Sequence, residues 1–165
     1  MALNTKKYNR VVLRHEQRIG ETKKFEEEVF PGQILEPSDS STDVLRTHST
    51  EGGDVNIVQV AEINYLLGKE IDEAYSEGER GPVLTLRTGD KFVCRLADGT
   101  NYSDGDILMS AGNGDLKQYT AQTSFEDSSN APMYPNRQVA RLLEDADLSG
   151  GSSADASQWA KCEVL

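Results

Sequence analysis

Short runs of apolar residues alternate with turn-forming pairs in the middle of the chain. Two β-prone runs, Phe92–Leu96 and Ile107–Met109, lie among the dipeptides Asp98-Gly99, Asp104-Gly105 and Asn113-Gly114. Asn, Asp and Gly tolerate the positive φ angles that two-residue hairpin loops need. The pattern therefore predicts a compact set of short strands, typical of a small barrel or sandwich.

Apolar positions predict further strands on both sides of this region. Val55–Ile63 carries apolar side chains on both faces and reads as a strand. A shorter strand begins at Ile34 and is expected to stop at Pro37, followed by a polar loop over residues 38–43. The last residues, Trp159–Leu165, alternate again and predict a strand that ties this end of the chain into a sheet.

One segment, Tyr65–Tyr75, has helical character, but Gly68 interrupts it, so only one or two short turns of helix are expected. Together these elements predict a mainly β fold: a small β-barrel or sandwich of short strands, with one short helix and an extended N-terminal arm. We assign residues 1–32 to the basic N-terminal arm and residues 33–165 to one β-rich domain. A long polar loop is expected in that domain at residues 120–136.

The charge of the chain narrows its range of partners. The 165 residues carry a formal net charge of −11, which excludes binding to nucleic acid through a general electrostatic footprint. The distribution is uneven, because residues 1–24 carry a net +5 and residues 25–165 a net −16. A basic leader on an acidic body predicts an arm that docks on an acidic surface, or one that folds back on its own body.

Neither a membrane segment nor a secretory signal is visible in the sequence. No run approaches the ~20 apolar residues of a membrane helix, and the first residues, MALNTKKYNR, have no apolar core. We therefore expect a soluble protein that is assembled in a cytoplasm and has no membrane partner.

Residues that could carry chemistry are scarce. No serine of the chain lies in a G-x-S-x-G motif that could form a catalytic pair with one of the two histidines, His15 and His48. Both histidines are therefore interpreted as surface residues. The two cysteines, Cys94 and Cys162, lack metal-ligand spacing, and Cys94 reads as a small buried apolar residue on a strand. We expect no enzymatic activity, no catalytic residue and no cofactor.

Two acidic clusters give partial matches to cation sites. Asp145, Asp147 and Ser149 match the opening of a calcium loop, but its twelfth position, which should be Glu, is Ala156. The acidic residues within 98–106 are explained by their place in turns. We interpret both clusters as solvated turns and assign no metal ligand, with a bound cation as the open alternative.

The order of several motifs within residues 56–165 resembles capsid decoration proteins, also called cement or head-stabilising proteins, of tailed double-stranded DNA viruses. The motifs are Ala61-Glu62, Leu67–Tyr75, Gly89-Asp90, Leu96–Gly99, Gly105–Leu108, Gly112–Leu116, Ala140–Glu144, Ser149–Gly151 and Cys162–Leu165. The acidic composition is in addition similar to that of proteins from viruses of halophilic archaea.

The resemblance implies a β-rich virion protein on the outer surface of the capsid. Such a protein would form homotrimers, clamp neighbouring subunits of the major capsid protein and stabilise the head against internal DNA pressure. Symmetric oligomers turn several weak contacts into strong binding, because the later contacts are intramolecular. By charge alone, the expected capsid-contact residues are Arg10, Arg14, Arg18, Lys23 and Lys24.

Other functions remain as alternatives. Gly89-Asp90 and Gly105–Leu108 also resemble a biotinyl or lipoyl carrier barrel, although Lys117 lies off the hairpin tip where the modified lysine should be. A small β binding module of a viral tail is a closer alternative. An enzyme of unrecognised type is disfavoured by the scarcity of His and Cys.

Overall fold

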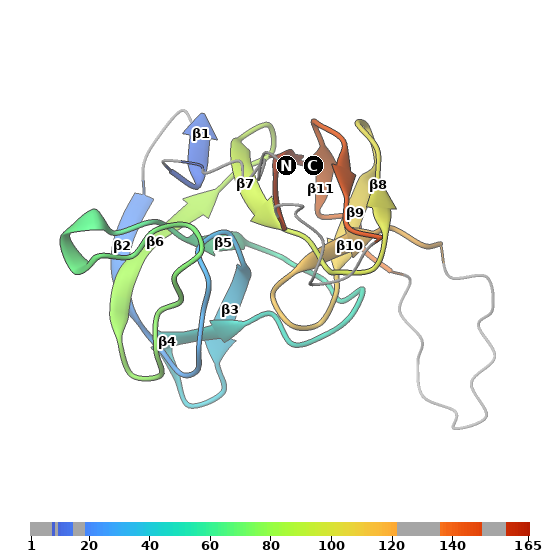
Figure 1. Cartoon of the computed structure of the whole chain (residues 1–165). Helices are drawn as coiled ribbons and strands as arrows, with labels where there is room; N and C mark the ends of the chain where they lie inside the picture. Colours follow the sequence, from blue (N-terminus) through green and yellow to red (C-terminus); the bar gives the residue numbers. More distant parts are fainter. Residues whose placement is uncertain (1–7, 9, 15–18, 122–135, 150–157) are drawn as a thin grey trace, which may run out of the picture.

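The structure is a computed structural model that describes residues 8, 10–14, 19–121, 136–149 and 158–165. Within these residues the chain forms a closed five-stranded barrel, a six-stranded sheet and a two-stranded ladder. Figure 1 shows the barrel on the left and the six-stranded sheet on the right. The expected mainly β fold with a small barrel is confirmed.

The barrel has the strand order β2-β4-β3-β5-β6, and β6 closes it against β2. Its strands are β2 (Ile19–Phe25), β3 (Ile34–Ser38), β4 (Ser41–Thr47), β5 (Val58–Ala61) and β6 (Arg80–Leu86). The β2–β4 pair is parallel and the other barrel pairs are antiparallel. We expected β2 within an extended arm, but its pairing with β6 makes it a wall of the barrel.

The hairpin of β3 and β4 corrects two expectations. The strand was expected to end at Pro37, yet β3 continues to Ser38, and much of the expected loop 38–43 belongs to β4. The register shifts directly after Pro37, and a proline is tolerated beside such an irregularity because the ladder there needs no N–H. The chain therefore turns within Ser38–Ser41 and returns at once.

The six-stranded sheet has the order β1-β7-β13-β11-β9-β10, with antiparallel neighbours throughout. Its strands are β1 (Val12–Arg14), β7 (Lys91–Arg95), β9 (Ile107–Ser110), β10 (Leu116–Gln118), β11 (Ala140–Leu142) and β13 (Trp159–Val164). The expected last strand is confirmed as β13, which lies between β7 and β11. Part of the basic leader, β1, forms an edge of this sheet, while the division of the chain at residue 32 stays a prediction.

The buried apolar side chains form two clusters, of which the larger holds the barrel and the sheet together. The larger cluster joins residues of the six-stranded sheet to barrel residues such as Ile34, and the smaller one contains barrel residues such as Leu35. Successive strand residues point to opposite faces, so β3 contributes to both clusters. Cys94 is buried as expected, and Cys162 is buried on the neighbouring strand, where burial raises the pKa of its thiol.

The expected helical segment is mostly irregular. Its helical part is a single 3-10 turn, η1 (Tyr65–Leu67), in the connection between β5 and β6. A two-stranded ladder of β8 (Asn101–Tyr102) and β12 (Ala146–Asp147) completes the set of strands found in the described ranges. None of the helical structure in those ranges is long and apolar enough to span a membrane.

Candidate functional site

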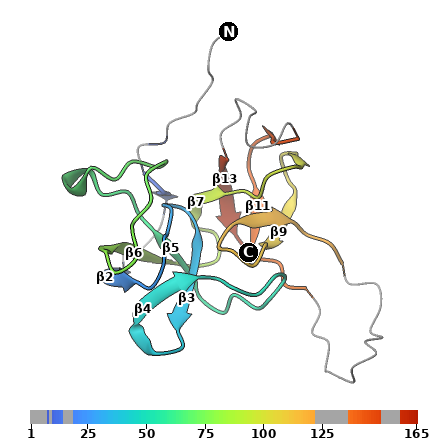
Figure 2. The ribbon, with the colours of Figure 1, turned by 60° about the horizontal axis from the view of Figure 1, so that its bottom comes forward.

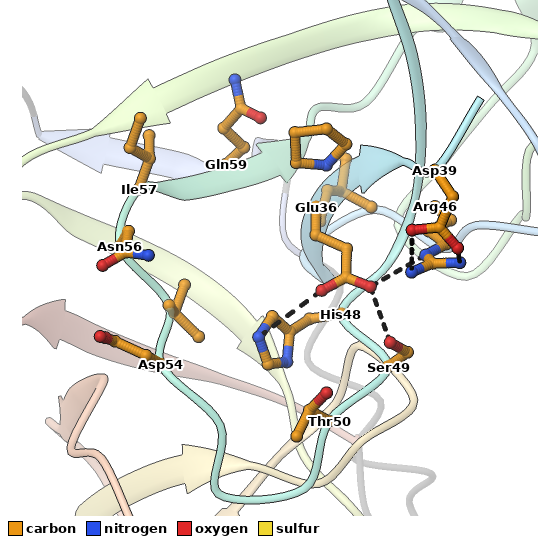
Figure 3. Close-up of a pocket in the computed structure, with 13 residues that line it drawn as sticks. Glu36, Asp39, Arg46, His48, Ser49, Thr50, Asp54, Asn56, Ile57 and Gln59 are labelled. Carbon is orange, nitrogen blue, oxygen red and sulfur yellow. Dashed lines mark hydrogen bonds and ion pairs between the residues drawn. The ribbon is translucent and has the colours of Figure 1, made fainter. Parts of the chain in front are cut away.

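A pocket of about 450 Å³ opens beside the β3–β4 hairpin. Residues of β3 and β4 line one side, and the segment 54–59 lines the other (Figure 3). Its position follows from the hairpin, whose short turn brings the charged residues of the two strands opposite one another.

Glu36 is the centre of the polar network in this pocket. It lies directly across the strand pair from Arg46, whose Nε donates a 2.9 Å hydrogen bond to Glu36 Oε1. Ser49 Oγ donates to the same oxygen at 2.7 Å. Burial acts to raise the pKa of Glu36, but the hydrogen bonds from Ser49 and Arg46 outweigh it and hold this pKa below its usual value. The carboxylate therefore stays ionised in mildly acidic solution.

Arg46 is held by the two carboxylates beside it, Glu36 and Asp39. Its guanidinium also donates to both oxygens of Asp39, at 2.9 and 3.2 Å. These contacts raise the pKa of Arg46 and leave the guanidinium oriented along the hairpin (Figure 3). The network is therefore suited to holding the hairpin rigid rather than to binding an incoming anion.

His48 was expected at the surface, but its side chain is buried in the structure. Its backbone N–H donates to Ile34 O at 2.9 Å, which continues the β3–β4 ladder and turns the ring inward. Nδ1 lies 2.8 Å from Ser110 Oγ, and Nε2 lies 3.7 Å from Glu36 Oε2. This burial left no signal in the sequence. The neighbours of His48 along the chain are polar, and its buried partner Ser110 is far away in the sequence.

The contacts of Ser110, His48 and Glu36 use the residue types of a hydrolytic triad, but their geometry favours a structural role. Ser110 has no exposed surface, and its Oγ also accepts the N–H of Gly112 at 3.2 Å. A serine nucleophile must reach the substrate carbonyl, which complete burial prevents. The cluster instead joins the barrel hairpin to β9.

Replacing His48 with leucine is expected to lower the free energy of unfolding by about 1–3 kcal/mol, because the buried Ser110 hydroxyl loses its side-chain partner. Urea denaturation of the purified variant measures this change. Ser49→Ala is the matched control, since its hydrogen bond to Glu36 is exposed, and it should cost less than about 1 kcal/mol. Equal stabilities of the His48 variant and the unmodified protein would contradict the structural role.

The five expected capsid-contact residues do not lie on one strand. Arg10 is exposed beside β1, Arg14 ends β1, and Arg18 lies outside the described residues. Lys23 and Lys24 lie on the barrel strand β2. Their role in binding a capsid stays a prediction.

Lys23 illustrates the alternative in which the basic leader contacts its own acidic body. Its Nζ lies 3.2 Å from an oxygen of Asp43, which belongs to the acidic body, and 2.9 Å from an oxygen of Glu21 in the leader itself. Hydrogen bonds to these two carboxylates raise the pKa of Lys23. Lys24, on the same strand, is exposed.

The partial calcium-loop motif was expected to be a solvated turn, but Asp147 ends the strand β12, and Ser149 lies in the turn that follows it. Asp147 Oδ1 accepts hydrogen bonds from both the backbone N–H and the hydroxyl of Ser149, at 3.0 and 2.7 Å. Asp145 Oδ1 accepts the N–H of Asp104 at 2.8 Å, which links the two acidic clusters. Among the residues that the structure describes, no group of three or more His, Cys, Asp and Glu side chains is placed to hold a metal ion.

A buried ion pair between two parts of the six-stranded sheet, β7 and the residue before β10, was missed by the sequence analysis. Arg95 of β7 lies 3.3 Å from Asp115, and their side chains are only 17% and 6% exposed. Gln33 Nε2 donates to the same Asp115 oxygen at 2.9 Å. The Arg95 guanidinium also lies 4.3 Å from the centre of the Phe30 ring. Arg95 is therefore held both by charge pairing with Asp115 and by cation–π attraction to Phe30.

Comparisons with known proteins identify one shared fold. No protein-family model matches the sequence, and no curated protein matches it. Among solved structures, the chain is similar to the head fiber gp8.5 N base of bacteriophage phi29, with a TM-score of 0.51 and 11% sequence identity. The similarity covers 90% of this chain and 95% of that chain. At this identity it shows the fold alone, and the expected halophilic archaeal host stays a prediction.

Proposed function

We propose that this protein is a structural virion protein that binds the outer surface of a viral head, with the major capsid protein as its partner. The observation that supports this most directly is the fold shared with a phage head fiber base over nearly the whole of both chains. An isolated barrel occurs in many unrelated proteins, but here the barrel and the attached sheet correspond together.

The proposed mechanism is a clamp made by a homotrimer. Each copy contributes one weak contact to the shell, and symmetry makes the contacts of one oligomer effectively intramolecular. Hydrogen bonds between the barrel and the sheet suit this role, since a clamp must transmit force between its contacts without deforming. We assign no enzymatic step to the protein.

The structure gives little support to the carrier alternative. A carrier barrel presents its modified lysine at an exposed hairpin tip, where it can swing between sites. Lys117 lies instead on β10, and its ammonium is paired with Glu51. A location on the viral tail remains the alternative that experiment must distinguish from a location on the head.

Purified virus particles provide the test of the proposed function. We expect cryo-electron microscopy to show this protein on the outside of the head, repeated at symmetry-related positions. Particles that lack the protein should release their DNA at a lower temperature than complete ones, and adding the purified protein should restore the difference. Density on the tail alone, or the absence of the protein from particles, would overturn the proposal.

A further inference from the structure

Two of the three most exposed large apolar residues of the described chain lie next to one another at the end of a projecting loop. Leu66 is 98% exposed and Leu67 is 53% exposed. We name the loop Asn64–Lys69, which carries them, the leucine tip. In Figures 1 and 2 its green helical turn projects from the side of the barrel that faces away from the six-stranded sheet.

Backbone hydrogen bonds hold the leucine tip in one conformation. Asn64 and Lys69 form a bridge in which each N–H donates to the other's carbonyl oxygen, at 3.1 and 3.0 Å. Leu67 N–H donates to Asn64 O at 3.0 Å, and Leu66 N–H donates to Asn64 Oδ1 at 3.1 Å. The two leucines are therefore presented on a closed, internally bonded turn.

The base of the tip is anchored in the barrel. Lys69 Nζ donates to Ala74 O at 2.7 Å and lies 3.1 Å from a Glu79 oxygen. Tyr75 is fully buried in the barrel cluster, and its hydroxyl donates to Glu62 O at 2.7 Å. The leucine tip would therefore lose little conformational entropy when a partner binds it, which improves the affinity for a given contact.

The charges that follow the tip are mostly negative. Exposed carboxylates of the same connection are Glu70, Asp72, Glu73 and Glu77. The positive side chain beside them, Lys69, is already paired with Glu79. A second copy of this acidic chain, or an anionic lipid surface, would be repelled here. A surface that carries lysine or arginine around an apolar hollow would be attracted.

We propose that the leucine tip inserts into an apolar socket, rimmed by lysine or arginine side chains, on the outer surface of the viral shell. This inference rests on the proposed function and assigns the surface through which the protein makes that contact. Burying two such leucines in the socket should increase the affinity for the shell by on the order of 30-fold or more.

The test uses the whole protein and purified particles that lack it. The double variant Leu66→Ser/Leu67→Ser should bind these particles at least ~30-fold more weakly than the unmodified protein. Ile57→Ser is the matched control, because Ile57 is also an exposed apolar residue, at 60%, but lies in the pocket beside β3. The control should bind normally, and both variants should keep their thermal stability and oligomeric state.

The charge of the socket is tested separately. Asp72→Lys should weaken particle binding several-fold at low ionic strength and less at high salt, because it places like charges together. Asp54→Lys, an equal charge change in the pocket loop, is its control. Equal effects of the two substitutions would overturn the basic rim.

The remaining outcomes distinguish failure of the tip from failure of the function. Unmodified protein that does not bind particles would overturn both. Normal binding of the double variant, or an equal loss in the Ile57 variant, would overturn the tip alone. A changed oligomeric state in the double variant would show that the tip joins copies of this chain. Leucine-dependent binding to phosphatidylcholine vesicles would assign the tip to a membrane, and either result would overturn the socket.

Discussion

Replacing Arg95 with methionine is expected to lower the free energy of unfolding by about 3–5 kcal/mol at neutral pH. The substitution keeps an apolar chain of similar length against the Phe30 ring but removes the charge that faces Asp115. Asp115 is buried, so its carboxylate would be left without a compensating cation. Chemical denaturation measures the change, and Arg80→Met, at an exposed position on β6, is the control, expected within about 0.5 kcal/mol.

The loss of stability in the Arg95→Met variant should depend on pH in a direction that identifies its cause. Burial already raises the pKa of Asp115, and Arg95 and Gln33 partly oppose this. Without Arg95 the folded-state pKa rises further above the unfolded value. The folded state then binds the proton more readily than the unfolded state. The stability of the variant therefore falls as the pH rises through the interval between the unfolded-state and folded-state pKa values, and it recovers below that interval. The difference between the Arg95 variant and the unmodified protein should therefore shrink as the solution is acidified towards the ordinary pKa of an aspartate.

A double variant separates the charge effect from lost packing. Arg95→Met/Asp115→Asn removes both charges while the amide can still accept the hydrogen bond from Gln33. It should be about 2 kcal/mol more stable than Arg95→Met alone, since removing one partner of a buried pair costs more than removing both. A double variant as unstable as the single one would assign the loss to packing instead.

Gly32→Ala is expected to lower the free energy of unfolding by about 3 kcal/mol or more, through two additive causes. Gly32 has φ +84°, a conformation that L side chains rarely adopt. A Cβ at this position would also lie 2.6 Å from the carbonyl oxygen of Val93. That oxygen belongs to the backbone of the six-stranded sheet, so it cannot move aside as a flexible side chain could.

Gly89→Ala separates these two causes. Gly89 has a similar φ of +89°, but a Cβ there would meet nothing within 4 Å. It should therefore cost only the backbone strain, about 1–2 kcal/mol. Thermal or urea unfolding of the two variants gives the contribution of the close approach as their difference. Equal costs would mean that the barrel and the sheet can separate slightly at Gly32 without penalty.

The sequence alone determined the class of the fold and many of its strands. Alternating apolar residues and Asp-Gly or Asn-Gly pairs predicted β7, β9 and β13 close to where they lie. Such signals are local, because the period of a strand and the chemistry of a turn depend on neighbouring residues. The same local rules failed at Pro37, where pairing with β4 extends the strand beyond its expected end.

The tertiary structure alone decided which residues meet. His48 contacts Ser110, and Arg95 contacts Asp115, across distances along the chain that no local pattern encodes. The leucine tip was hidden for the opposite reason. Its apolar residues read as part of a helix, which normally buries one face, and only the fold showed that the turn projects away from both cores. Burial and exposure depend on the whole set of long-range pairings, so the surfaces that bind a partner become visible only after the chain has folded.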